Sequence, residues 1–292
     1  MGPTIIMTLL AMPRLEPPRR RPAQHREPRL SHSPATRGLG IAVDDMSGSI
    51  RRPPDSEEMT MRWLLSTVLL STLVQAPLEP GVHDTTLEVE GVGTVTYGIY
   101  IPRDYDPAEP RPLVLALHPG GSRGPYYGTQ FLRGVVAPAL SDWGAIIVAP
   151  DAPARSWANA TSERGVLALL DDVMERYTID RDRVLVTGFS LGGRGTWYMA
   201  ARHPDLFTAA IPMAARSNRD DAEQVGDMPV FIIHARADQV VPFEPAAQLA
   251  REMDERGQTV SFMPLDGVGH FQMGATPLRA GGQWVVERWA ER

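Results

Sequence analysis

A serine stands between two glycines in Gly188-Phe189-Ser190-Leu191-Gly192, directly after the apolar run 183–188 and before a helical pattern. A nucleophile on such a strand-to-helix turn has a strained backbone that lifts its Oγ clear of the sheet, and side chains two residues away on either side would collide with neighbouring backbone. The following helix points its N–H groups and its dipole at the same place. Because a chance match to this pentapeptide has a likelihood on the order of one in ten, its context must carry the argument.

Two candidate partners for Ser190 follow it in the order acid, then histidine. Asp238 comes just after the apolar run 230–234, and His270 lies in a Gly-rich loop after the run 260–264. A serine nucleophile needs a base, and the base needs a carboxylate to orient it. Asp238 could instead be a turn residue and His270 an ordinary loop histidine, but their order and their strand-end positions together favour the catalytic interpretation.

Other titratable residues compete less well. Asp266 is an alternative acid, but it lies only four residues before His270 and not at a separate strand end. His234 lies inside a strand pattern, which predicts a core histidine or one that supports the site. His203 and Asp205 read as a helix end and a surface loop, and we assign them no chemical role.

Acyl transfer also needs N–H donors for the oxyanion that develops on the carbonyl. The apolar run 113–118 ends in His118-Pro119-Gly120-Gly121, which is similar to the HGGG-type oxyanion loop. Pro119 has no N–H, so the donor is Gly120 or Gly121. We predict Gly120, paired with the N–H of Leu191; the alternative is a plain Pro-Gly turn.

The remaining patterns predict the elements that position these residues. Two alternating strands, 85–90 and 94–101, read as a hairpin. Further strand candidates, mostly continuous apolar runs typical of strands covered on both faces, lie at 113–118, 145–150, 183–188, 209–213, 230–234 and 260–264. Helical patterns lie at 162–177 (with Ser162 as N-cap), 191–203, 244–256 and roughly 277–291.

This alternation predicts an α/β fold, a doubly wound and mostly parallel sheet with an N-terminal antiparallel hairpin. In such sheets chemistry collects at the carboxyl ends of the strands, where the candidate residues lie. Only about twenty residues separate 209–213 from 230–234, so we expect a minimal lid or none. Arg155 and Trp157 follow the run 145–150 and are predicted to contact substrate; the alternative is a surface loop in which Trp157 is a packing anchor.

Composition excludes several classes of site and partner. The chain has no cysteine, which excludes disulfides, cysteine zinc sites and a thiol nucleophile. Every basic residue is arginine, and residues 61–292 carry twenty of them against twenty-eight acidic residues. This acidic balance argues against nucleic acid as a partner.

The first 76 residues do not resemble a folded domain. Residues 1–60 are rich in Pro and Arg without apolar periodicity, and we expect them to be disordered or not translated; a basic binding tail is the alternative. Residues 61–76 have the charge, the apolar run and the small residues of a signal peptide cleaved after Ala76. The apolar run is too short to span a bilayer, so we expect export to the periplasm or outside the cell without stable membrane insertion. Residues 77–84 are then a linker and 85–292 a single catalytic domain.

Four stretches carry a resemblance to a known superfamily: "YGIYIPRDYDPAEPRPLVLALHPGG", "IDRDRVLVTGFSLGGRGTWYMAARHPDLFTAAIPM", "HARADQVVPFEPA" and "GVGH". Together they resemble the α/β-hydrolases, and within them the secreted esterases that include feruloyl and acetylxylan esterases, polyhydroxyalkanoate depolymerases and prolyl-oligopeptidase-type peptidases. Two positions depart from the common pattern, Pro119 in the oxyanion loop and Ala235 before the acid loop. The resemblance covers roughly residues 85–292.

The resemblance implies a serine hydrolase that cleaves carboxylic esters through Ser190, His270 and Asp238, with an acyl-enzyme intermediate and no metal or organic cofactor. A serine peptidase of prolyl-oligopeptidase type and a polyester depolymerase are the alternatives, and a non-catalytic binding protein on the same scaffold is a third. The substrate is expected to be a small or polymer-attached ester. The choice among esters, and the oligomeric state, stay open at this level.

Overall fold

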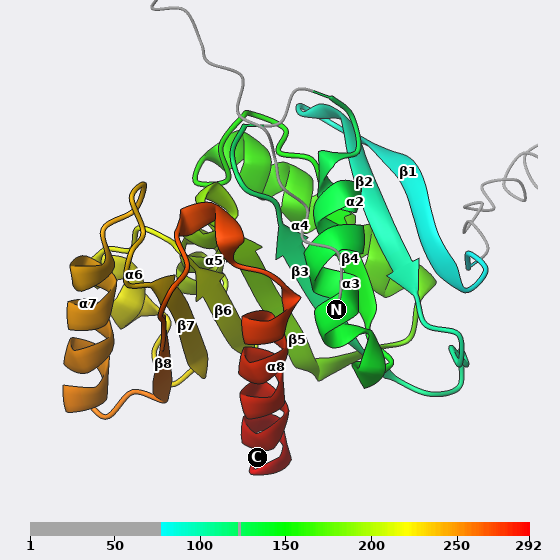
Figure 1. Cartoon of the computed structure of the whole chain (residues 1–292). Coiled ribbons are helices and arrows are strands. Elements are labelled where there is room, and N and C mark those ends of the chain that lie inside the picture. The colour runs from blue at the N-terminus through cyan, green and yellow to red at the C-terminus, as the bar shows by residue number, and fades with distance from the viewer. Residues whose placement is uncertain (1–76, 122–123) are drawn as a thin grey trace, which may run out of the picture. The chain divides into compact units, whose positions relative to one another are not determined.

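The computed structural model describes residues 77–121 and 124–292 (Figure 1). The predicted signal peptide and the segment before it lie outside the described residues. The sheet has eight strands in the order β1-β2-β4-β3-β5-β6-β7-β8, antiparallel at β1, β2 and β4 and parallel from β4 onward. The strands are β1 (Gly81–Val89), β2 (Gly93–Ile101), β3 (Arg111–Leu117), β4 (Ile146–Pro150), β5 (Ile179–Phe189), β6 (Ala209–Met213), β7 (Val230–Ala235) and β8 (Val260–Leu265).

The buried parts of the central strands are mostly apolar, as expected where both faces of a sheet are covered. In β3, Leu113, Leu115 and Leu117 belong to one buried core, whereas Val114 and Ala116 belong to the other. This is the period-two alternation of side chains across a strand, with an apolar layer on each side. The predicted α/β fold with its antiparallel hairpin is therefore confirmed.

Helices form the two covering layers (Figure 1). The first core is closed by α4 (Ala160–Arg176), α5 (Leu191–Arg202), α6 (Arg219–Gln224) and α7 (Phe243–Glu255). The second is closed by α2 (Tyr127–Phe131), η1 (Leu132–Val136), α3 (Ala137–Leu140), η2 (Ser141–Trp143) and α8 (Ala275–Ala290). A last short helix, η3 (His270–Gln272), follows β8. Within residues 77–121 and 124–292, no helix has the length and apolar character needed to cross a membrane.

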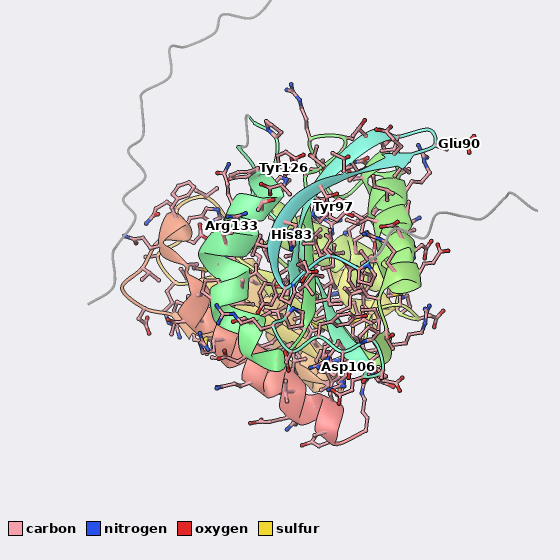
Figure 2. All side chains as sticks on the ribbon, turned by 90° about the vertical axis from the view of Figure 1, so that its right-hand side faces the viewer. His83, Glu90, Tyr97, Asp106, Tyr126 and Arg133 are labelled. Carbon is pink, nitrogen blue, oxygen red and sulfur yellow. The ribbon has the colours of Figure 1, made fainter. Side chains whose placement is uncertain are left out.

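The start of the hairpin corrects the expected linker. β1 begins at Gly81 rather than at residue 85, and its first residue pairs with Ile101 of β2. Residues 81–84 carry little apolar alternation, so their strand conformation comes from backbone pairing with β2 and has no strong side-chain signal. Figure 2 views this side of the molecule, where the Arg133 guanidinium of η1 donates to the Val82 carbonyl at 3.5 Å.

Local capping corrects the start of α4. Asn159, not Ser162, is the N-cap: its side chain accepts hydrogen bonds from the N–H groups of Thr161 and Ser162, both at 3.0 Å. Ser162 lies inside the first turn, fully buried, and its hydroxyl donates to the Ser156 carbonyl. Asparagine is among the strongest N-cap residues, and its extended backbone suits that position.

The helical segment 127–143 and the short α6 were not predicted. The first is divided among α, π and 3-10 turns and contains Gly128, Gly134 and Pro138, which weaken a helical pattern. α6 is six residues long and largely polar, and its N-cap is Asn218, whose side chain accepts from the N–H of Asp221 at 2.7 Å. Both segments depend on tertiary packing, the first against β2, β3 and β4, and α6 against α5 and α7.

Candidate active site

Ser190 stands at the turn between β5 and α5. Its backbone has φ 56° and ψ −111°, in a region that a non-glycine residue rarely adopts, and its N–H donates to the Met213 carbonyl at 2.9 Å. A Cβ at Gly188 would lie 2.4 Å from the Gly192 carbonyl oxygen, and a Cβ at Gly192 would lie 1.8 Å from that of Leu117. Neither glycine can therefore carry a side chain unless the turn rearranges.

Three side chains from separate strand ends meet at this turn. His270, at the start of η3, has its Nε2 2.9 Å from the Ser190 Oγ, and its Nδ1 2.7 Å from Oδ2 of Asp238, which follows β7. Both partners are hidden from solvent: His270 is 2% exposed and the Asp238 side chain 0%. Because the carboxylate can only accept, His270 carries its proton on Nδ1 and presents Nε2 as the acceptor for the Ser190 hydroxyl.

The loop after β3 lies against the start of α5. A Cβ at Gly120 would lie 3.6 Å from the Leu191 side chain. Both residues line a cavity of about 520 Å³, together with His118, Gly121, Gly124, Pro125, Asp151, Ala152 and Arg155. The first N–H groups of a helix have no partner within it, so the beginning of α5 at Leu191 suits an anion next to Ser190.

Comparison with known proteins identifies the superfamily. The model of the dienelactone hydrolase family matches residues 143–275. Feruloyl esterase C of Emericella nidulans is 27% identical over 213 residues, covering 64% of this chain and 75% of that protein. A solved thermostable esterase is 28% identical with a TM-score of 0.61, covering 72% of this chain and 62% of its own. Cutinase 2 of Thermobifida cellulosilytica is 27% identical over 179 residues, covering 59% of this chain and 64% of that protein.

The chain is an esterase of the α/β-hydrolase superfamily. Its described residues include no group of three or more His, Cys, Asp or Glu side chains placed to hold a metal ion.

Asp238 is held by more than its hydrogen bond to His270. Oδ1 of Asp238 accepts from the N–H groups of Val240 and Val241, both at 2.8 Å, while Oδ2 faces His270. Burial by itself would raise the pKa of Asp238, but the hydrogen bonds from His270, Val241 and Val240 outweigh it and hold the pKa below its ordinary value. Asp238 is therefore a carboxylate in a fixed orientation.

His234 lies directly behind the acid and is fully buried. Its Nε2 donates to the Val241 carbonyl at 3.0 Å and is 3.4 Å from Oδ2 of Asp238. Burial lowers the pKa of His234, despite the opposing effects of the Val241 carbonyl and the Asp238 charge, which favours the neutral ring. The imidazole thus joins the end of β7 to the loop that carries the acid.

The competing residues lie elsewhere. Asp266 is exposed and pairs with Arg236 at 3.2 Å. His203 is at the C-terminal end of α5, and its Nε2 lies 2.8 Å from Oε1 of Glu163. Asp205 is exposed in the loop that follows α5. None of the three is hydrogen-bonded to Ser190, His270 or Asp238 within the described part of the chain.

The loop after β3, our predicted oxyanion loop, is held by His118, whose role the sequence did not reveal. Nε2 of His118 accepts from the N–H of Ala152 at 3.1 Å, so the ring proton is on Nδ1, which donates to the Pro119 carbonyl at 2.7 Å. Burial lowers the pKa of His118, although the Pro119 carbonyl and the charge of Asp151 act in the opposite direction. A neutral imidazole therefore joins the loop after β3 to the loop after β4.

The two residues predicted to contact substrate lie in different environments. Arg155 lines the cavity, is exposed, and has φ 55°. The prediction for Trp157 is wrong, because its ring is only 1% exposed and its Nε1–H donates to the His118 carbonyl at 2.9 Å. Trp157 packs beneath the loop after β3 and is too buried to reach a bound ester.

Proposed function

We propose that this esterase cleaves carboxylic esters through a covalent acyl-enzyme on Ser190. The observation that carries the proposal is the continuous chain of hydrogen bonds from Asp238 through His270 to Ser190, at 2.7 Å and 2.9 Å. Such a chain lets a neutral imidazole remove the hydroxyl proton while the carboxylate fixes the tautomer and stabilises the cation.

The reaction follows in two halves. Ser190 Oγ attacks the ester carbonyl carbon as its proton passes to Nε2 of His270, and the N–H groups of Gly120 and Leu191 stabilise the oxyanion. The imidazolium then protonates the leaving alcohol oxygen, and the alcohol departs from the acyl-enzyme. In the second half His270 takes a proton from water, hydroxide adds to the acyl carbon, and the carboxylic acid leaves as Ser190 regains its proton.

For the substrate, the similarity to feruloyl esterase C and to a cutinase supports a bulky or polymer-attached ester. The short α6 is the only helix between β6 and β7, so no lid domain is inserted at that point. Arg155 lines the cavity next to the oxyanion loop and is our candidate substrate contact there. The pattern of residues 61–76 supports export with cleavage after Ala76; exported protein that retained residues before 77 would contradict it.

Two measurements on purified protein test the proposal. We expect hydrolysis of p-nitrophenyl butyrate without comparable hydrolysis of a peptide p-nitroanilide, and labelling of Ser190 by a fluorophosphonate, located by peptide mass spectrometry. Faster cleavage of the anilide would indicate a peptidase. Folded protein that is neither labelled nor active would indicate a binding protein on this scaffold.

The pH dependence of activity follows from the roles of Asp238 and His270. Because its pKa is lowered, Asp238 stays ionised to lower pH than an ordinary aspartate, so protonation of Asp238 does not set the acid limit of activity. Activity should still fall toward acid pH, because only a neutral imidazole can act as a general base. A profile of kcat/KM against pH measures this, and a rate that stayed flat from about pH 4 to about pH 8 would contradict it.

The lowered pKa of Asp238 also stabilises the fold. Its contribution is fully present above the ordinary aspartate pKa and is lost as pH falls through the depressed value of the folded state. Melting temperatures of the wild type and of Asp238→Asn should therefore converge at the acid end.

A further inference from the structure

Exposed large apolar side chains are few and are concentrated at the active site. In residues 77–121 and 124–292 they are Val240, Phe271 and Val286, which are 49%, 71% and 42% exposed. Val240 is two residues beyond Asp238, and Phe271 directly follows His270. Single exposed apolar residues are common on proteins, but two of three next to the acid and the base suggest a contact surface.

The loops that carry Val240 and Phe271 touch each other. The Val240 N–H donates to Oδ1 of Asp238 at 2.8 Å, and Nδ1 of His270 lies 2.7 Å from Oδ2 of the same carboxylate. A Cβ on Gly269 would lie 2.8 Å from the Gln239 side-chain oxygen, which places the two loops in direct contact. One buried carboxylate therefore joins the two loops that carry the exposed side chains.

Phe271 has little packing of its own. Its ring stands edge-on to His270, with centroids 5.0 Å apart and planes at 88°. Exposed side chains of Gln239 and Gln272 lie on the same two loops. The Gln272 side-chain oxygen accepts from the Gly269 N–H at 2.7 Å, which leaves its NH₂ available to a ligand. An open aromatic ring flanked by amides can bind a group with one flat apolar face and polar edges.

The sheet order shows which part of an ester meets this surface. The cavity that holds Gly120 and Arg155 is formed by the loops after β3 and β4, on one side of β5, and is closed by Leu191 at the start of α5. Asp238 and His270 follow β7 and β8, on the other side of β5. Nε2 of His270 must give its proton to the leaving oxygen. The alcohol part of the ester therefore departs on the side of Phe271, and the oxyanion faces the cavity.

We propose that Phe271, assisted by Val240, binds the alcohol part of the substrate and selects esters of bulky alcohols that present a flat, apolar face. This inference rests on the proposed serine esterase function and specifies which ester bond the site accepts. A hydrocarbon ring and the C–H face of a sugar ring share the required chemistry.

The test varies the alcohol and keeps the acid constant, with methyl butyrate, benzyl butyrate and 6-O-butyryl-glucose as substrates. In Phe271→Ala we expect the ratio of kcat/KM for benzyl butyrate to that for methyl butyrate to fall by about tenfold, mainly through KM. Phe271→Tyr should restore the ratio because it restores the ring. A parallel fall for 6-O-butyryl-glucose would show that sugar rings bind the same surface, and a fall confined to the benzyl ester would restrict it to hydrocarbon rings.

The matched control is Val286→Ala, which removes an exposed apolar side chain from α8 and should leave the ratio unchanged. An unchanged ratio in Phe271→Ala would overturn the inference, and so would an equal loss on every ester, which would indicate an effect on His270 alone. Wild-type protein that hydrolysed none of the three esters would overturn the proposed function as well, so the two failures are distinguishable.

Discussion

Ser190→Ala is expected to lower the turnover of carboxylic esters by about 10⁶-fold, because serine and histidine act as one unit and the remaining groups cannot form an acyl-enzyme. Among the described residues, the side-chain group hydrogen-bonded to Nε2 of His270 is the Ser190 hydroxyl: Oγ lies 2.9 Å from Nε2, and the other ring nitrogen is engaged with Asp238. The measurement is kcat on p-nitrophenyl butyrate, with enzyme in excess to detect slow turnover.

Stability and substrate binding should change little in Ser190→Ala, since alanine removes one oxygen and introduces no clash. Ser141→Ala in η2 is the matched control, a serine-to-alanine change at a partly exposed position before β4, and should retain full activity. If Ser190→Ala kept even a tenth of the wild-type rate, Ser190 would not be the nucleophile and the acyl-enzyme mechanism would have to be abandoned.

Asp238→Asn is expected to lower kcat by about 10⁴-fold while the fold stays intact. In the wild type Oδ1 accepts from two backbone N–H groups, at Val240 and Val241, so the asparagine oxygen will occupy that place and its NH₂ will face His270. His270 must then accept at Nδ1 and carry its proton on Nε2. In that tautomer it cannot take the proton of Ser190.

Asp266→Asn is the control for Asp238→Asn. It changes a carboxylate that is 81% exposed and paired with Arg236, so activity should remain close to that of the wild type. The NMR signals of the imidazole N–H protons should show the altered tautomer in Asp238→Asn alone. A large loss of activity in Asp266→Asn with a small loss in Asp238→Asn would show that Asp266, and not Asp238, is the acid that orients His270.

Much of the fold could be predicted because its signals are local. Continuous apolar runs predicted the central strands, and amphipathic spacing predicted α4, α5, α7 and α8 to within a few residues. The helical segment 127–143 was not predicted because glycines and a proline divide it. The strand conformation of residues 81–84 was not predicted because an edge strand takes its conformation from its partner. Boundaries of this kind depend on pairing and packing that no short window of sequence contains.

The candidate site shows the same division. The positions of Ser190, Asp238 and His270 after three parallel strands, β5, β7 and β8, were sufficient to predict that they meet, because parallel strands bring their carboxyl ends to one edge of a sheet. Trp157 shows the limit of that reasoning: it lies in a loop at this edge, yet its ring turns inward beneath His118. Whether a loop side chain faces solvent or core depends on the neighbours that pack around it.

The sequence by itself determined the type of sheet, the glycines that the Ser190 turn requires, and which acid and base could join the nucleophile, because each depends on residue type and strand order. Only the tertiary structure decided which oxygen of Asp238 faces His270, how His118 and His234 support the loops, and that Phe271 stays exposed beside the base. These features arise from distances between segments far apart in the chain, and such distances exist only once the two apolar cores have closed around the sheet.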